Sequence, residues 1–175
     1  MATKGSDLSR YIRDIPDWPK PGILFRDITP LLADPHAFPS AVDAMCAPFF
    51  GAGVQYVAAV EARGFIFGAA VAGRLGAGFI PIRKKGKLPG ATESASYELE
   101  YGVDLIEMHR DDVPAGAKIL MVDDLLATGG TMHAACQLVE KVGAEIVGIS
   151  FLIELTDLHG RHKLAPHKIH TLISY

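Results

Sequence analysis

The sequence predicts an α/β protein with a doubly wound, mainly parallel sheet and a small N-terminal hood. Strand-like apolar runs alternate with amphipathic helical stretches along 175 residues, which is the pattern of βαβ units. The clearest unit covers residues 119–153, where an apolar strand leads through a small-residue loop into a helix and then into a second β-branched run. Such a unit implies parallel strands joined by a right-handed crossover.

The first 34 residues do not follow this alternation. Apolar residues at helical spacing predict a short helix over 8–15, which Pro16 ends, and the proline-rich run to Pro21 predicts a loop. We expect residues 1–34 to form the hood over the carboxyl edge of the sheet. Residues 35–175 then form the core, and the length gives no reason for more than one domain overall.

Apolar patterns predict the elements in the middle of the chain, namely helices over 35–50 and 64–75 and strands over 56–60, 79–82 and 103–109. Glycine and alanine in the second helix would let it pack closely on the sheet. Residues 83–96 carry charge, glycine and proline without a period, so they predict a mobile loop.

The stretch from Ile119 to Thr131 carries the strongest functional signal. Asp123 and Asp124 end a buried strand, and the small-residue loop Ala127-Thr128-Gly129-Gly130-Thr131 opens the next helix. Backbone N–H groups at a helix N-terminus favour a phosphate, and ligands of open α/β sheets bind at the carboxyl ends of strands. Because adjacent strand residues point to opposite faces, one carboxylate can reach the ligand while the other supports the loop. A phosphate cradle beside a diol-binding acidic pair describes a phosphorylated ribose.

The alternative is an ordinary strand-to-helix turn with two capping carboxylates. No lysine follows Gly130 as a P-loop requires, and the dinucleotide fingerprint G-x-G-x-x-G is absent. In the helix that follows, Thr131 is expected to cap the start, and Gly143 is well placed to end it.

Several segments resemble the type I phosphoribosyltransferase family, and the likeness runs from about Asp14 to Leu164. They are the stretch Ile119–Thr131, Pro21-Gly22-Ile23-Leu24-Phe25-Arg26-Asp27-Ile28, Glu61-Ala62-Arg63-Gly64-Phe65, Arg83-Lys84-Lys85-Gly86-Lys87-Leu88-Pro89-Gly90 and Tyr97-Glu98-Leu99-Glu100-Tyr101-Gly102. Phe25-Arg26 and Glu100-Tyr101 narrow the resemblance to the adenine-specific members. It implies an enzyme that transfers the 5-phosphoribosyl group from phosphoribosyl pyrophosphate (PRPP) to adenine, giving AMP and pyrophosphate.

The resemblance assigns the ribose and the 5′-phosphate to the central stretch. Asp123 and Asp124 would bind the ribose 2′ and 3′ hydroxyls. The 5′-phosphate would lie on the N–H groups and hydroxyls of Ala127, Thr128, Gly129, Gly130 and Thr131.

Pyrophosphate is expected at two places. Glu61, Ala62 and Arg63 would form the pyrophosphate loop, with a cis Glu61–Ala62 peptide and Arg63 as a catalytic fork for the leaving group. Where some relatives carry Asp-Ser, this chain has Glu61-Ala62, so a side-chain hydroxyl contact is in doubt. The basic run contains Arg83, Lys84, Lys85 and Lys87. Such a charge run is usually a solvated surface loop, but the resemblance implies that Lys84 and Lys87 neutralise pyrophosphate. Arg83 either reaches across a dimer interface or forms a structural pair.

The resemblance places adenine against Phe25 and Leu126, two residue types that more often only pack. Backbone groups of Leu24 and Arg26 would read the edge of the base. From the mobile loop over 83–100, Glu100 would contact the imidazole edge of adenine, accepting the proton that adenine loses or stabilising one at N7. Tyr101 would support that loop. The alternative for Glu100 is a solvated side chain, which is usual for a lone glutamate in a loop.

Composition excludes several other classes. A formal charge of −3 gives no global attraction to nucleic acid or an anionic membrane. The two cysteines, Cys46 and Cys136, fall in helical patterns and suggest no disulfide framework, which favours the cytoplasm. The N-terminus shows no signal-peptide core and no apolar run is long enough to span a membrane. The seven histidines form no metal pattern, so Mg²⁺ is expected to bind through PRPP and water, and a homodimer is implied by resemblance alone.

Three other functions compete with this interpretation. An oxopurine phosphoribosyltransferase would read a 6-oxo group, often with a lysine, where this chain offers Phe25 and a backbone edge. A PRPP-sensing regulator commonly adds a DNA-binding domain, for which there is no room here. A structural α/β module would not need Asp123, Asp124, Arg63 and Glu100 together.

Overall fold

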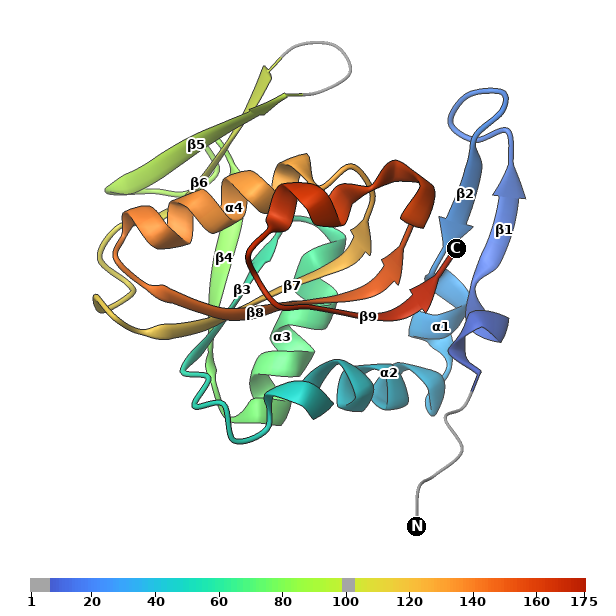
Figure 1. The fold of residues 1–175 in the computed structure, drawn as a ribbon, viewed down its shortest axis with the longest axis horizontal. Helices are drawn as coiled ribbons and strands as arrows, with labels where there is room; N and C mark the ends of the chain where they lie inside the picture. Colours follow the sequence, from blue (N-terminus) through green and yellow to red (C-terminus); the bar gives the residue numbers. More distant parts are fainter. Residues whose placement is uncertain (1–6, 99–102) are drawn as a thin grey trace.

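The computed structural model describes residues 7–98 and 103–175 and contains a seven-stranded sheet with helices on both faces (Figure 1). The strand order is β5-β6-β4-β3-β7-β8-β9, and β4, β3, β7, β8 and β9 are parallel to one another, while β5 and β6 form an antiparallel edge. The strands are β3 (Tyr56–Val60), β4 (Gly78–Lys84), β5 (Thr92–Glu98), β6 (Val103–His109), β7 (Lys118–Leu126), β8 (Glu145–Glu154) and β9 (Ile169–Ser174).

Helices α2 (Ala37–Cys46) and α3 (Arg63–Leu75) cover one face of the sheet, and α4 (Gly130–Lys141) covers the other (Figure 1). Each face has its own apolar core. Phe67 and Leu120 belong to the core under α2 and α3, whereas Met121 and Phe151 belong to the core under α4. The prediction of a doubly wound, mainly parallel sheet is therefore confirmed.

A separate two-stranded antiparallel sheet precedes the core, in the part of the chain for which the sequence predicts a hood. It consists of β1 (Arg13–Pro16) and β2 (Leu24–Asp27), flanked by the 3-10 turn η1 (Leu8–Tyr11) and the short helix α1 (Thr29–Ala33). The predicted helix over 8–15 is wrong. So short a segment is marginal as a helix in water, and pairing with β2 extends its second half into a strand.

The predicted loop over 83–96 is also wrong at both of its ends, over half of its length. Strand β4 continues to Lys84, and β5 begins at Thr92 and pairs with β6 over its whole length. Side chains of Ala95 and Tyr97 pack against the core under α4. Tertiary pairing thus imposes strand structure on a segment of weak local pattern, and only the turn over 85–91 remains irregular.

Two helix ends differ from the sequence prediction. The helix expected over 35–50 ends at Cys46 and passes into a 3-10 turn, η2 (Ala47–Phe49), whose second residue is Pro48. Helix α4 begins at Gly130 with Gly129 as its N-cap and without a side-chain cap, so the predicted capping by Thr131 is wrong. Gly143 adopts a φ of 84° just beyond the helix, as predicted for a C-terminal stop.

Strands β7, β8 and β9 point toward the β1–β2 hairpin, and the C-terminus lies beside β2 (Figure 1). A contact fixes this arrangement, because the guanidinium carbon of Arg26 in β2 lies 3.6 Å from the ring centroid of Tyr175. The hairpin therefore stands at the carboxyl edge of the sheet. Among the described residues, no helix is long and apolar enough to cross a membrane.

Candidate active site

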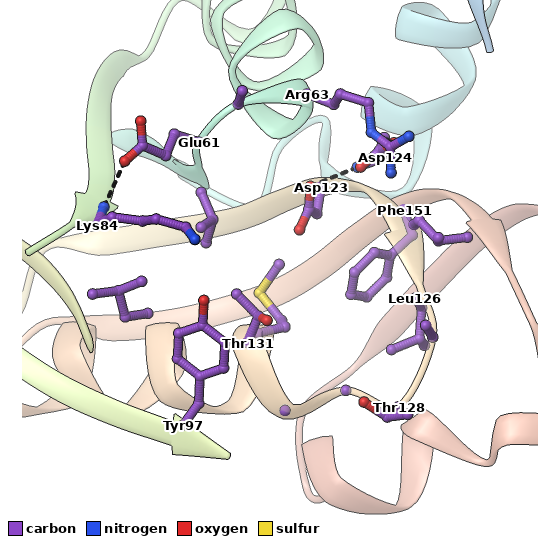
Figure 2. Close-up of a pocket in the computed structure, with 18 residues that line it drawn as sticks. Glu61, Arg63, Lys84, Tyr97, Asp123, Asp124, Leu126, Thr128, Thr131 and Phe151 are labelled. Carbon is purple, nitrogen blue, oxygen red and sulfur yellow. Dashed lines mark hydrogen bonds and ion pairs between the residues drawn. The ribbon is translucent and has the colours of Figure 1, made fainter. Parts of the chain in front are cut away.

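A cavity of about 430 Å³ opens at the carboxyl edge of the sheet. Most of its wall comes from the end of β3 with the following residues to Arg63 and from the end of β7 with the following residues to Met132, and neighbouring strands supply the rest (Figure 2). Its lining residues are Val60, Glu61, Ala62, Arg63, Lys84, Tyr97, Ile106, Asp123, Asp124, Leu125, Leu126, Ala127, Thr128, Gly129, Gly130, Thr131, Met132 and Phe151. Two stretches far apart in sequence, 61–63 and 123–131, thus meet where the sequence predicts a site.

Asp123 and Asp124 both line this cavity, although side-chain alternation along a strand predicts that only one would. The Arg63 Nε lies 2.8 Å from Asp124 Oδ2, and the side chain of Asp124 is only 8% exposed. Asp123 Oδ1 accepts a hydrogen bond of 2.9 Å from the Asp124 backbone N–H. A Cβ on Gly64 would lie 2.7 Å from the same Asp123 oxygen, so glycine at the start of α3 makes room for this carboxylate.

Burial raises the pKa of both carboxyl groups above the usual range. The neighbouring charge of Asp124 adds to the raised pKa of Asp123, while Arg63 acts in the opposite direction on both. Each carboxylate oxygen can accept more than one hydrogen bond, so the pair can accept further donors beside those of the protein. Hydroxyl groups of a ligand would supply such donors, which suits a diol.

The loop over 127–131 faces the carboxylates and leads directly into α4. Gly129 adopts a φ of 78°, which places it in the left-handed region that favours glycine. The first N–H groups of a helix have no partner within the helix, and the dipole favours an anion there. The loop therefore presents the donors that an anionic phosphate needs.

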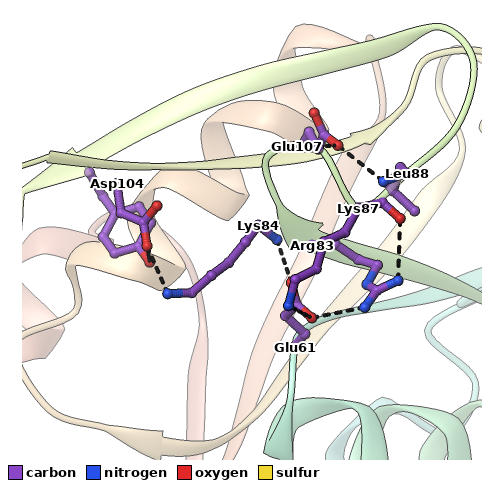
Figure 3. Close-up of polar contacts among 9 residues, drawn as sticks. Glu61, Arg83, Lys84, Lys87, Leu88, Asp104 and Glu107 are labelled. Carbon is purple, nitrogen blue, oxygen red and sulfur yellow. Dashed lines mark hydrogen bonds and ion pairs between the residues drawn. The ribbon is translucent and has the colours of Figure 1, made fainter.

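Glu61 binds the basic run rather than facing a ligand alone (Figure 3). Its carboxylate accepts hydrogen bonds from Arg83 Nη2 at 3.1 Å, from the Lys84 backbone N–H at 2.6 Å and from Lys87 Nζ at 3.3 Å. Burial raises the pKa of Glu61, but these donors outweigh it and the net pKa is lowered. Lys84 Nζ pairs instead with Asp104 Oδ2 at 2.9 Å. Arg83, Lys84 and Lys87, the three cations of the basic run assigned to pyrophosphate, thus all have a carboxylate partner.

Glu107 binds the turn over 85–91, which follows β4 and contains Lys87 of the basic run (Figure 3). Glu107 is 4% exposed, and its carboxylate accepts hydrogen bonds from the backbone N–H groups of Gly86 and Leu88 at 3.0 and 3.2 Å. The Thr92 hydroxyl adds a third at 3.4 Å. Glu61, just after β3, and Glu107 in β6 therefore fix the turn beside the cavity. The Glu61–Ala62 peptide is cis, as the resemblance implies.

The predicted adenine residues of the hairpin are not part of the cavity wall. Phe25 lies nearest, with its ring centroid 5.5 Å from the guanidinium carbon of Arg63, and Trp18 packs edge-on against it at 4.4 Å. The side chain of Arg26 pairs with Asp14 and stacks on Tyr175. Among the described residues, β2 pairs only with β1, so the backbone groups on its other edge are available to hydrogen-bond a ligand.

Some site residues escape the sequence prediction. Tyr97 and Phe151 line the cavity without having been assigned a role, and only the alternation along 92–98 could have pointed to Tyr97. Burial raises the pKa of Tyr97, whose hydroxyl lies 3.2 Å from Asp104 Oδ2. Glu100 and Tyr101 lie outside the described residues.

The fold and this site belong to a defined class of protein. The model of the family "Phosphoribosyl transferase domain" matches residues 50–171, which is more than half of the chain. The chain therefore belongs to the phosphoribosyltransferase family, and its fold is the type I fold of that family.

Similarity over nearly the whole chain narrows the class to the adenine phosphoribosyltransferases. The enzyme of that name from Rhodopirellula baltica is 56% identical over 97% of this chain and 82% of its own length. The one from Thermobifida fusca is 54% identical over 98% of both chains. The crystal structure of the Thermoanaerobacter pseudethanolicus enzyme shares 50% identity over 96% of this chain and 98% of its own, with a TM-score of 0.93.

A fourth relative was solved with ligands. The adenine phosphoribosyltransferase of Saccharomyces cerevisiae, complexed with D-2,5-dideoxy-2,5-imino-altritol 1,6-bisphosphate and adenine, has a TM-score of 0.90 and 40% identity over 94% of this chain and 95% of its own.

Proposed function

We propose that this protein transfers the 5-phosphoribosyl group from PRPP to adenine, forming AMP and pyrophosphate. One observation carries the proposal: a carboxylate pair, Asp123 and Asp124, and a helix-opening loop line the same cavity, the one suited to a ribose diol and the other to a phosphate. The adenine specificity rests on the named relatives of the chain.

The reaction replaces the bond between C1 of the ribose and pyrophosphate by a bond to a nitrogen of adenine, which loses its proton. Bond cleavage runs ahead of bond formation, so positive charge builds on the sugar ring. The protein has little covalent work to do, and it must align the two reactants and stabilise the leaving group. Asp123 and Asp124 hold the ribose hydroxyls, while the loop over 127–131 holds the 5′-phosphate.

The leaving pyrophosphate lies between Arg63 and the basic turn. Arg63 is half-exposed and anchored on Asp124 through Nε, which leaves its terminal nitrogens for pyrophosphate oxygens. Lys84 and Lys87 add positive charge, and their carboxylate partners keep them in place until the anion arrives. Arg83 contacts Glu61 of the same chain, and a role for Arg83 across a dimer interface remains a prediction.

Adenine lies between the hairpin and the cavity. Phe25 stacks on the base, Leu24 and Arg26 read its edge through backbone groups, and Leu126 packs against the ring. Glu100 accepts the proton that adenine loses, and Tyr101 supports the segment that carries Glu100.

The residues of the cavity also fit Mg²⁺, a hard cation that prefers oxygen ligands and keeps several waters. Burial, and then the neighbouring charge of Asp124, raise the pKa of Asp123, and a nearby cation would favour its ionised form. Asp123 and Asp124 would hold the ion through water, and the ion would neutralise the oxygens of PRPP. Among the described residues, no group of three or more His, Cys, Asp or Glu side chains could hold a metal by itself.

A homodimer in the cytoplasm completes the proposal. Apolar side chains of Phe50 and Ile66 are 52% and 41% exposed, which suits a surface buried by a second copy. The cysteines Cys46 and Cys136 are both buried and free, which suits a reducing compartment. Light scattering at micromolar concentration tests the dimer.

Release of pyrophosphate from PRPP and Mg²⁺ tests the function when adenine, hypoxanthine, guanine or no base is supplied. Release with adenine alone is expected. Release with an oxopurine would keep the phosphate site but overturn the base assignment. Binding of PRPP without release on any base would indicate a regulator in place of an enzyme.

A further inference from the structure

The C-terminal turn η4 (Gly160–Leu164) lies directly behind the phosphate loop 127–131. A Cβ on Gly160 would collide with the carbonyl oxygen of Ala127 and lie 3.1 Å from the backbone nitrogen of Gly129. Reciprocally, a Cβ on Gly129 would lie 2.6 Å from the carbonyl oxygen of Gly160. Backbone therefore packs against backbone at this point, and neither position has room for a side chain.

The loop needs such support because, outside the regular elements of the described residues, the backbone groups that bond here are carbonyl groups, one at Leu126 just before the loop and one at Gly129 within it. The Leu126 carbonyl accepts the Leu155 N–H at 2.9 Å, and the Gly129 carbonyl accepts the His133 N–H at 2.9 Å. The N–H groups that would bind a phosphate must stay unpaired. Packing from behind is the way to fix them without using those donors.

Arg161 holds the turn in place. Its Nε and Nη2 donate to both oxygens of Glu154 at 2.8 and 2.7 Å, and it also donates to the Ile169 carbonyl at 3.3 Å and to Thr171 Oγ1 at 3.1 Å. Glu154 is 6% exposed at the end of β8. The planar guanidinium of Arg161 thus donates through all three of its nitrogens, a geometry that the single ammonium group of lysine cannot reproduce. The sheet thus fixes Arg161, and Arg161 fixes Gly160.

We propose that Gly160 and Arg161 are positioning residues for the 5′-phosphate of PRPP and AMP, acting through the shape of the loop over 127–131. The inference rests on the proposed function, because it takes this loop as the phosphate site. A merely structural role would stabilise the C-terminal turn without affecting any ligand selectively.

Calorimetric titration with two ligands separates these roles. AMP carries the 5′-phosphate, whereas Mg²⁺–pyrophosphate occupies the other end of the cavity. Gly160→Ala is expected to raise the Kd of AMP by at least about tenfold, the loss of roughly one charge-assisted hydrogen bond, and to change the Kd of pyrophosphate by less than about twofold. Gly73→Ala is the matched control, because a Cβ there meets nothing within 4 Å, and it leaves both values unchanged.

Arg161→Gln keeps the proposal testable if Gly160→Ala does not fold. It is expected to show the same selective loss of AMP binding, and Arg161→Lys an intermediate loss. Unchanged AMP binding in both Gly160→Ala and Arg161→Gln, or equal weakening of AMP and pyrophosphate, overturns the proposal whatever the melting temperatures are.

Thr131→Val separates failure of this inference from failure of the proposed site. If Thr131→Val weakens AMP binding and the Gly160 and Arg161 variants do not, only the positioning role is wrong. If none of these variants weakens AMP binding, the phosphate site itself is misassigned.

Discussion

Asp123 shows how a single residue combines a cost in stability with a gain in binding. Its carboxyl group lies partly buried beside Asp124, and Gly64 leaves the space it occupies. Its pKa is raised in the folded state, so its stabilising contribution is fully present below the unfolded pKa and is lost as the pH rises through the folded pKa. At higher pH the Asp123 carboxyl group therefore lowers the stability of the free protein, and a ligand that donates hydroxyl groups recovers part of this energy.

Asp123→Asn is expected to raise the melting temperature at pH 7 by a few degrees, about 2–4 °C for each kcal/mol in a chain of this size. The gain shrinks toward pH 4, because Asp123 then takes up a proton in the wild type as well. PRPP affinity falls by about tenfold or more, since the asparagine amide replaces one charged acceptor of the diol. Calorimetric melts from pH 4 to 8 and a PRPP titration measure both effects, and a lower melting temperature at pH 7 would contradict the account.

Glu100→Gln tests the assigned proton acceptor. We expect kcat to fall by more than about tenfold, the lower range for general acid–base catalysis, with a much smaller change in the KM of PRPP. Steady-state rates with adenine measure it, and Glu98→Gln serves as the neighbouring control. Near-normal turnover of Glu100→Gln would remove that role.

At the scale of elements, the turn between β4 and β5 depends on carboxylates from outside the turn. The Glu107 carboxylate accepts hydrogen bonds from Gly86 and Leu88 of the turn and from Thr92, so its removal loosens the turn without taking away a group assigned to a ligand. Ordering the turn in advance reduces the entropy lost when pyrophosphate binds.

Glu107→Ala is therefore expected to raise the Kd of Mg²⁺–pyrophosphate about threefold to tenfold, which equals the loss of one or two hydrogen bonds. The Kd of AMP changes less, because the phosphate loop lies on another element. Calorimetry measures both, and Glu145→Ala at the exposed start of β8 is the control. A larger effect on AMP than on pyrophosphate would show that the turn serves a different part of the site.

The elements differ in how far local sequence determines them. The strand, loop and helix over 119–142 could be predicted because strand and helix periodicity are complete within one contiguous stretch. Strand β5 could not, since Thr92, Ser94 and Ser96 are polar and its stability comes from pairing with β6. Likewise, Arg13–Pro16 becomes a strand only through its partner β2.

The same distinction applies to the site. Asp123, Asp124 and the loop over 127–131 are contiguous, so their joint chemistry is visible in the sequence. Tyr97 and Phe151 reach the cavity from separate strands, and nothing in their local sequence predicts that they meet. The support of the phosphate loop by Gly160 is a contact between distant backbones, which only the structure reveals.

At the scale of the molecule, the C-terminal strand ties the hairpin to the sheet. The Tyr175 ring stacks under Arg26 of β2, and the Tyr175 carbonyl accepts hydrogen bonds from the Thr156 N–H and hydroxyl. The strand proposed to read adenine is thus attached to the end of β9.

Tyr175→Ala is expected to raise the KM of adenine about threefold, since a cation–π contact contributes roughly 0.5–1 kcal/mol. The KM of PRPP stays near the wild-type value. Tyr175→Phe keeps the ring and is the matched control. Equal changes in both KM values would mean that the strand end supports the whole sheet and not the hairpin in particular.

One cavity at the carboxyl edge of the sheet is proposed to bind the phosphoribosyl group, and a crystal structure with AMP bound would reveal whether it does. We expect the 5′-phosphate on the N–H groups of the loop over 127–131, and the ribose hydroxyls on Asp123 and Asp124. A phosphate on the basic turn over 83–87, with the loop over 127–131 empty, would contradict it.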